Sequence, residues 1–181
     1  MENNQLAAEI YKSAYITGEF LLRSGQTSNE YFDKYLFESS PYLLNQITNK
    51  MLELIDDDFD ILGALEMGGI PIATLLSVKL DKPILFIRKK AKEYGTCKFA
   101  EGVDYKGKKI LMVEDVVTSG GQIIISTDDI RKSGGIVQKA VCVIDRQSGG
   151  REKLSEHGIE LYPLFTMEYI KASAKEFGYI K

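Results

Sequence analysis

One segment of the sequence, from residue 108 to residue 122, constrains the fold of this chain more than any other. It begins as an apolar run that ends at Val113, supplies two adjacent carboxylates, Glu114 and Asp115, and then passes through hydroxyls and glycines into a second apolar segment. This order predicts a strand, a site, a loop and a helix. In an open parallel sheet, ligands bind outside the carboxyl ends of the strands, and a glycine-rich turn into a helix offers free N–H groups to an anion.

The pairing of acids with a phosphate cradle predicts a phosphorylated sugar as the ligand. The phosphate suits the cradle, and two carboxylates beside it suit hydroxyls or a metal that the substrate carries. Neither G-x-x-x-x-G-K-[ST] nor a G-x-G-x-x-G after a strand occurs in the sequence, which argues against a P-loop NTPase and a dinucleotide-binding site. Each feature alone also occurs in ordinary surface connections, but their combination after a buried strand favours a site.

The composition indicates a single-domain, cytoplasmic protein that spans residues 1–181. The chain has 44% hydrophobic and 27% charged residues, enough to bury its own core. Residues 1–5 lack a basic leader region and no apolar run reaches the ~18 residues that span a bilayer, so we expect neither export nor contact with a membrane. Two separate cysteines, Cys97 and Cys142, indicate reduced thiols. A net charge of -3 argues against general nucleic-acid binding.

Strands and helices alternate along the chain as they do in parallel β-α-β units. Apolar runs predict strands at 61–65, 83–88, 109–114, 137–144 and 159–164. Helical periodicity and capping residues predict helices at 5–16, 41–56, 70–80, 120–133, 150–157 and 167–177. We therefore expect an α/β fold in which helices flank both faces of a mostly parallel sheet. The segment at about 18–40 fits this alternation poorly and predicts a small hood over the end of the sheet that carries the site.

The 108–122 pattern resembles the ribose-phosphate motif of the type I phosphoribosyltransferases, and four other segments resemble the orotate phosphoribosyltransferases in particular. These are Phe20–Gly25 with Tyr31–Asp33, Gly69–Thr74, Arg88–Gly95, and Asp145 with Arg146. They stand in the family's order. The resemblance implies the type I phosphoribosyltransferase fold and transfer of ribose 5-phosphate from phosphoribosyl diphosphate to orotate, giving orotidine 5'-phosphate and pyrophosphate in pyrimidine biosynthesis. It also implies Mg²⁺ and a homodimer.

A basic segment follows the strand predicted at 83–88. Five cations occur within eleven residues, at Arg88, Lys89, Lys90, Lys92 and Lys98. A solvated basic face is one interpretation. The other is a loop, 88–102, that closes over the departing pyrophosphate and stabilises it in the transition state. The resemblance implies that Arg88, Lys89, Lys92 and Tyr94 contact the pyrophosphate, partly across a dimer interface, with Arg88 and Lys92 catalytic. Because Tyr94 stands where many family members have histidine, a proton-transfer role there stays open.

The family's ribose and diphosphate contacts correspond to two loops of this chain. Glu114 and the catalytic Asp115 would hold the ribose hydroxyls, and Asp115 would reach a substrate-borne Mg²⁺ through water, with no direct protein ligand. The turn that follows would grip the 5-phosphate; its residues are Val116, Val117, Thr118, Ser119, Gly120, Gly121 and Gln122. Gly68 and Gly69 would let backbone N–H groups approach the diphosphate, although an ordinary strand-to-helix turn has the same sequence.

The base site is predicted from single residues. Arg146 is placed to pair with a carboxylate, and the Thr118 hydroxyl to reach a ring edge. By the resemblance, Tyr31 and Phe32 pack against orotate and Arg23 replaces the family's common lysine. The two aromatic residues could equally form the core of the hood.

Two other functions stay open. The acceptor could be another base, such as a purine, because the ribose motif is shared across the superfamily. The chain could also be a regulator that binds phosphoribosyl diphosphate without turnover. The first 17 residues are too short for a helix-turn-helix domain, and the basic segment favours catalysis.

Overall fold

A six-stranded sheet forms the centre of the molecule. The computed structural model describes residues 1–21, 25–90 and 99–180. The strand order is β5-β4-β3-β6-β7-β8, and every neighbouring pair is parallel except β4 and β5. The strands are β3 (Ile61–Leu65), β4 (Ile84–Ile87), β5 (Ala100–Gly102), β6 (Lys109–Val117), β7 (Ile136–Asp145) and β8 (Glu160–Thr166). The predicted α/β fold with a mostly parallel sheet is confirmed.

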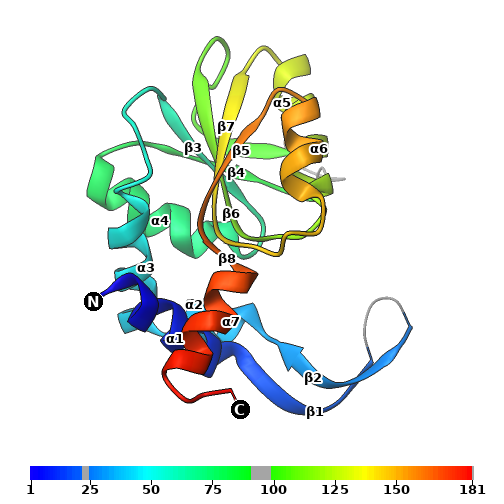
Figure 1. Cartoon of the computed structure of the whole chain (residues 1–181). Helices are drawn as coiled ribbons and strands as arrows, with labels where there is room; N and C mark the ends of the chain where they lie inside the picture. Colours follow the sequence, from blue (N-terminus) through cyan, green and yellow to red (C-terminus); the bar gives the residue numbers. More distant parts are fainter. Residues whose placement is uncertain (22–24, 91–98, 181) are drawn as a thin grey trace.

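Helices cover both faces of this sheet (Figure 1). One face packs against α3 (Pro41–Met51) and α4 (Gly69–Leu80), and the other packs against α5 (Gly121–Lys132) and α6 (Gly150–Glu156). Side chains alternate between the two cores along each strand, so that Leu62 belongs to the first core and Ile61 to the second. Burial on both faces explains why the strands are near-continuous apolar runs in the sequence.

The order of the strands fixes where a ligand can bind. The chain runs from β3 through α4 to β4 on one side, and then continues to β6 on the other side of β3. The connections that leave β3 and β6 therefore diverge, and in open sheets ligands bind outside the carboxyl ends of the strands at such a point. In this sheet that point, called the crevice here, lies between the 66–69 loop and the turn after β6.

A separate layer covers the carboxyl end of the sheet (Figure 1). Here β1 (Tyr15–Leu21) and β2 (Thr27–Phe32) form an antiparallel pair, followed by the short helix α2 (Lys34–Glu38). Most of these elements lie in the segment predicted as a hood, at about 18–40, although β1 begins earlier, at Tyr15. Two further helices, α1 (Asn3–Ala14) and α7 (Met167–Glu176), pack on each other beside them and share one apolar core with the sheet. The hood thus rests on both ends of the chain.

Several local features differ from the sequence prediction. The helix expected at 5–16 spans Asn3–Ala14, and Tyr15 and Ile16 belong to β1. The strand expected at 109–114 continues to Val117, because Val116 and Val117 pair with the end of β7. Glu114 and Asp115 are therefore part of the strand and do not follow it. The helix expected at 41–56 ends at Met51. None of the helices in the described part of the chain is long and apolar enough to cross a membrane.

Candidate functional site

The 66–69 loop lies directly against strand β6. A Cβ added at Gly68 would lie 1.5 Å from Oδ2 of Asp115, and one added at Gly69 would lie 2.2 Å from the carbonyl oxygen of Val113. Only glycine fits at either position, since those distances are far inside van der Waals contact. The sequence therefore keeps the 66–69 loop free of side chains so that its backbone can lie against the end of β6. Beside these glycines, the Glu66 carboxylate accepts a hydrogen bond from the Lys89 N–H.

Asp115 lies at the centre of this contact and is fully buried. Its Oδ1 accepts a hydrogen bond from the Val116 N–H, and its Oδ2 forms an ion pair with the ammonium of Lys34 from α2. Glu114 accepts a hydrogen bond from the Asp115 N–H at 3.2 Å. A third carboxyl, Glu38 of α2, is also buried close by. Three carboxyl groups and one ammonium thus share a small volume between the hood and the sheet.

The environment determines which of these carboxyls is ionised. Burial, together with the charge of Asp115, raises the pKa of Glu114 well above its usual value and the pKa of Glu38 to about 9. Burial alone would also raise the pKa of Asp115. However, its contacts with Glu114, Lys34 and Glu38 outweigh that effect and lower its pKa. The surroundings of Asp115 therefore favour its ionised form, whereas those of Glu114 and Glu38 favour the protonated form.

The turn after β6 has the geometry of an anion-binding site. Thr118 and Ser119 are exposed, Gly120 has a φ of +69° that favours glycine, and Gly121 begins α5. The first N–H groups of a helix lack partners within it, and the helix dipole makes this end positive. Among the other predicted phosphate residues, Val116 is half-buried, Val117 is buried, and the Gln122 amide donates to Ser126 Oγ at 3.2 Å.

Three of the residues predicted for the base lie around one cavity. A pocket of about 430 Å³ lies between the hood and the end of β7, and its lining includes Tyr15, Glu30, Tyr31, Phe32, Arg146 and Lys171. The Arg146 guanidinium lies 6.0 Å from the centre of the Phe32 ring. Tyr31 is 44% exposed and so is not buried in a hood core, whereas Phe32 packs against the apolar core that the hood shares with the sheet. Of the other two residues predicted for the base, Thr118 is not among those that line this cavity, and Arg23 lies outside the described residues.

The basic segment is described only in part. Arg88 Nε pairs with Glu101 Oε1 at 2.9 Å, which links the end of β4 to β5, and Lys89 is exposed. Residues 91–98 lie outside the described part of the chain, so the predictions for Lys92 and Tyr94 stay predictions. The antiparallel pairing of β4 with β5 brings the two ends of the segment together at the edge of the sheet.

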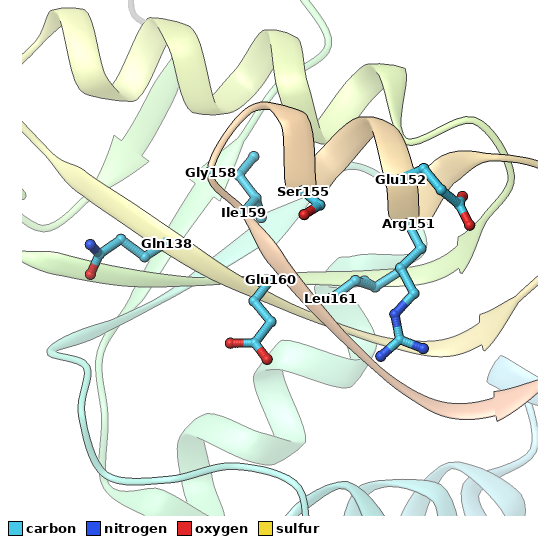
Figure 2. Close-up of a pocket in the computed structure, with 8 residues that line it drawn as sticks. All are labelled: Gln138, Arg151, Glu152, Ser155, Gly158, Ile159, Glu160 and Leu161. Carbon is cyan, nitrogen blue, oxygen red and sulfur yellow. The ribbon is translucent and has the colours of Figure 1, made fainter.

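A larger hollow, of about 790 Å³, lies elsewhere (Figure 2). Figure 2 shows Arg151 and Glu152 on α6 and Glu160 on β8 at its rim. It contains none of the predicted site residues. Gln138 and Glu160 also stand near the amino ends of their strands, away from the edge where ligands bind in this fold. Size alone therefore does not identify the functional site.

Sequence reasoning missed Lys34 and Glu38, which reach Asp115, and Lys171, which lines the base cavity. Their positions depend on how α2 and α7 pack on the sheet, and no local sequence motif indicates that packing. In the described residues, no group of three or more His, Cys, Asp or Glu side chains is placed to hold a metal ion.

Phosphoribosyltransferases resemble this chain in sequence and in fold. Residues 38–158 match the phosphoribosyl transferase domain family. The orotate phosphoribosyltransferase of Nocardioides sp. is 47% identical over 173 residues, which cover 96% of each chain. The crystal structure of orotate phosphoribosyltransferase from Aeropyrum pernix is 26% identical, with a TM-score of 0.78 over 96% of this chain and 99% of the other.

A third comparison supports the fold alone. The Mycobacterium tuberculosis orotate phosphoribosyltransferase, solved in complex with 5-phospho-alpha-D-ribosyl 1-diphosphate, is 22% identical, with a TM-score of 0.77 over 93% of this chain and 98% of the other. The matching domain family includes the glycine loop, the buried acid and the phosphate turn, and the matched relatives extend this agreement over nearly the whole chain. The chain belongs to the orotate phosphoribosyltransferase family.

Proposed function

We propose that this orotate phosphoribosyltransferase of pyrimidine biosynthesis transfers ribose 5-phosphate from phosphoribosyl diphosphate to orotate with the residues of the crevice described above. The observation that carries the proposal is the buried Asp115 of β6, which lies against the side-chain-free glycine loop on the strand that leads into the turn before α5. Such a site offers negative charge to a sugar and positive potential to its phosphate. No covalent intermediate on the enzyme is needed.

The ribose 5-phosphate would bind along the end of β6. The turn from Thr118 to Gln122 would hold the phosphate through its N–H groups and hydroxyls. Asp115 would accept hydrogen bonds from the ribose hydroxyls with Glu114 beside it. As the bond at C1 breaks, positive charge develops on the ribose, and a carboxylate fixed close to it stabilises that charge more in the transition state than in the ground state.

The diphosphate would lie over the 66–69 loop. Because Gly68 and Gly69 carry no side chains, their N–H groups can approach its oxygens closely, and Arg88 and Lys89 stand at the start of the basic segment nearby. By family resemblance, Lys92 and Tyr94 would complete this contact when the segment closes. The leaving pyrophosphate would then meet cations and backbone donors on two sides.

The residues present also fit the Mg²⁺ that the family resemblance implies. Carboxylate oxygens are the ligands that Mg²⁺ prefers, and the ionised Asp115 adjoins the glycine loop where the diphosphate would lie. Asp115 would hold the ion through water while the diphosphate provides direct ligands. When bound, Mg²⁺ would neutralise part of the charge that develops on pyrophosphate.

The base would occupy the cavity beside Arg146. A guanidinium there suits the carboxylate of orotate, which purines and uracil lack. Tyr31 and Phe32 would pack against the ring, and Thr118 would reach its edge, with Arg23 contributing from the hood. The cation at this position favours orotate over a purine acceptor, and a pocket for an acceptor favours catalysis over a purely regulatory role.

Two further parts of the proposal rest on sequence and resemblance. We propose a homodimer in which each subunit lends the 88–102 segment to its neighbour, and a cytoplasmic location in keeping with the reduced cysteines expected from the sequence.

A steady-state assay tests the proposal. The purified chain is given phosphoribosyl diphosphate and Mg²⁺ with orotate, uracil, adenine or hypoxanthine, and pyrophosphate release is measured for each. We expect kcat/KM to be highest for orotate by orders of magnitude. Turnover of a purine at a comparable rate would assign a different acceptor, and binding of phosphoribosyl diphosphate without turnover of any base would indicate a regulator.

A further inference from the structure

Asp115 cannot be reached by a substrate in the arrangement that the structure shows. Its side chain has no exposed surface, although it is the residue expected to contact the ribose. Oδ1 is engaged by the Val116 N–H, and Oδ2 lies between Gly68 and the ammonium of Lys34. Gly68 is buried and has no side chain that could move aside, and Asp115 itself belongs to strand β6. The side chain of Lys34, which is 33% exposed, is the covering group that can leave toward solvent.

The hood holds Lys34 in this place. Asp33 caps α2 by accepting a hydrogen bond from the Tyr35 N–H at 3.1 Å, which makes Lys34 the first residue of the helix. At the other end of α2, Phe37 is fully buried in the core that the hood shares with the sheet. The ammonium also lies 5.3 Å from the centre of the Tyr35 ring. The backbone of α2 is thus anchored, while a long, flexible side chain spans the gap to Asp115.

The charges explain why this contact forms in the free enzyme. A buried carboxylate without a partner is strongly unfavourable, and neither Glu114 nor Glu38 can neutralise Asp115. Among the described residues, Asp115 forms one ion pair, with Lys34. The ribose hydroxyls, or a water bound to Mg²⁺, would need Oδ2 of Asp115, the oxygen that the Lys34 ammonium occupies. The ammonium and the substrate therefore compete for Asp115.

We propose that Lys34 is a latch: it closes the hood onto Asp115 in the free enzyme and leaves that carboxylate when phosphoribosyl diphosphate binds. The proposal rests on the role of Asp115 in the proposed function. Lys34 is a positioning residue, because it keeps Asp115 ionised and oriented until the substrate replaces it. Substrate binding then requires the Lys34 side chain to leave Asp115 while α2 stays in place, which couples the contact between hood and sheet to occupancy of the ribose site.

Chemical labelling of the wild-type enzyme tests the latch directly. The chain is treated with a limiting amount of acetic anhydride, with and without phosphoribosyl diphosphate and Mg²⁺, and acetylation of each lysine is measured by mass spectrometry. A lysine ammonium held by a carboxylate reacts slowly, so we expect the labelling of Lys34 to rise several-fold when the substrate binds. Lys132, whose side chain is 76% exposed on α5, serves as the reference. Unchanged or reduced labelling of Lys34 would overturn the proposal.

A pair of variants tests the competition independently. Lys34→Met keeps the length of the side chain and removes its charge, so we expect the Kd for phosphoribosyl diphosphate with Mg²⁺, measured by calorimetry without orotate, to fall several-fold. Lys132→Met is the matched control and should bind as the wild type does. Weaker or equal binding by Lys34→Met would mean that Lys34 either contacts the substrate or does not compete with it. If Lys34→Met does not fold, the labelling result decides alone.

The outcomes for the latch and for the proposed function are separable. Wild-type turnover of orotate tests the function, whereas labelling and calorimetry use phosphoribosyl diphosphate alone. A rise in Lys34 labelling in an enzyme that does not turn over orotate would support the latch and contradict the function.

Discussion

At the scale of single residues, the chemistry of this site depends on one charge. Three carboxyl groups meet where the hood covers the sheet, yet burial raises the pKa of Glu114 and Glu38, whereas the contacts of Asp115 lower its pKa. A charge fixed in a dry crevice is worth more to a cationic transition state than the same charge in water. Each variant predicted at this scale therefore removes one charged or ionisable group.

The first change is Asp115→Asn. The amide keeps the size of the side chain but loses the charge-assisted contact with the ribose, so kcat should fall about a hundredfold or more. A steady-state assay of pyrophosphate release gives kcat. Asp128→Asn, on the exposed side of α5, is the control for loss of a carboxylate and should be unaffected. A rate within about threefold of the wild type would remove Asp115 from the mechanism.

Arg146 is predicted to act on one substrate only. If its guanidinium pairs with the orotate carboxylate, Arg146→Ala should raise the KM for orotate about tenfold or more, while the Kd for phosphoribosyl diphosphate changes little. Arg151→Ala, on α6 at the other hollow, controls for loss of a surface arginine. Equal weakening for both substrates would indicate that Arg146 supports the fold through Phe32 instead.

Glu38 should make stability depend on pH. Burial is the main reason that its pKa rises from 4.5 to about 9. A carboxyl whose pKa is higher in the folded chain stabilises the fold below its unfolded pKa, and this contribution is lost as pH rises toward the folded value. We therefore expect the Tm of Glu38→Gln to exceed that of the wild type by a margin that grows from about pH 5 to about pH 8.5. A margin independent of pH would show that Glu38 is ionised in the fold.

At the scale of elements, the site is built by the close approach of one loop to one strand. The glycines after β3 let the chain turn directly over the end of β6, and that contact defines the crevice. The same lack of side chains is needed for packing and for binding. A substitution at one of these glycines should therefore weaken the binding of phosphoribosyl diphosphate by more than the loss of stability explains.

Gly69→Ala tests this statement. The new methyl would meet the Val113 carbonyl at 2.2 Å, so the loop must move away from the crevice and the Kd for phosphoribosyl diphosphate should rise strongly. Gly63→Ala is the matched control, since its methyl would meet Ile110 at 2.8 Å within the sheet core. Both variants should have a lower Tm, by overpacking. Similar Kd values for the two variants would show that the 66–69 loop does not bind the diphosphate.

The regular elements were predictable because their signals are local. Strand β3 has the predicted bounds, and α5 differs from the prediction by one residue at each end. The helix predicted at 41–56 was too long, because Leu54 and Ile55 continue the apolar period beyond Met51, where the helix ends. The three-residue β5 and the five-residue α2 are too short to give a period.

The site was predictable only where its residues form motifs in the sequence. Glu114, Asp115 and the glycine turns form motifs in the sequence, and the structure brings them together at one crevice. Lys34 and Glu38 could not be found in this way, because they reach Asp115 only after the hood has packed on the sheet, and the two partners are far apart in the chain. Sequence patterns report faces and turns, whereas such contacts depend on tertiary packing.

At the scale of the whole molecule, the open question is whether one chain completes its own site. The basic segment starts at β4 and returns at β5, on the outer edge of the sheet, whereas the base cavity lies at β7. A segment anchored at an edge can serve the neighbouring subunit of a dimer as readily as its own. We expect the shared arrangement, with Lys92 as the cation that reaches the leaving group.

Mixing two inactive variants tests this arrangement. Lys92→Ala should lose kcat with a modest change in the affinity for phosphoribosyl diphosphate, because an open loop contributes little to ground-state binding. Mixed with Asp115→Asn, it should regain activity, since one site of the mixed dimer combines an intact Asp115 with an intact Lys92. Random pairing of equal amounts predicts about a quarter of wild-type activity. No recovery, with subunit exchange verified by mass spectrometry, would show that each chain uses its own loop.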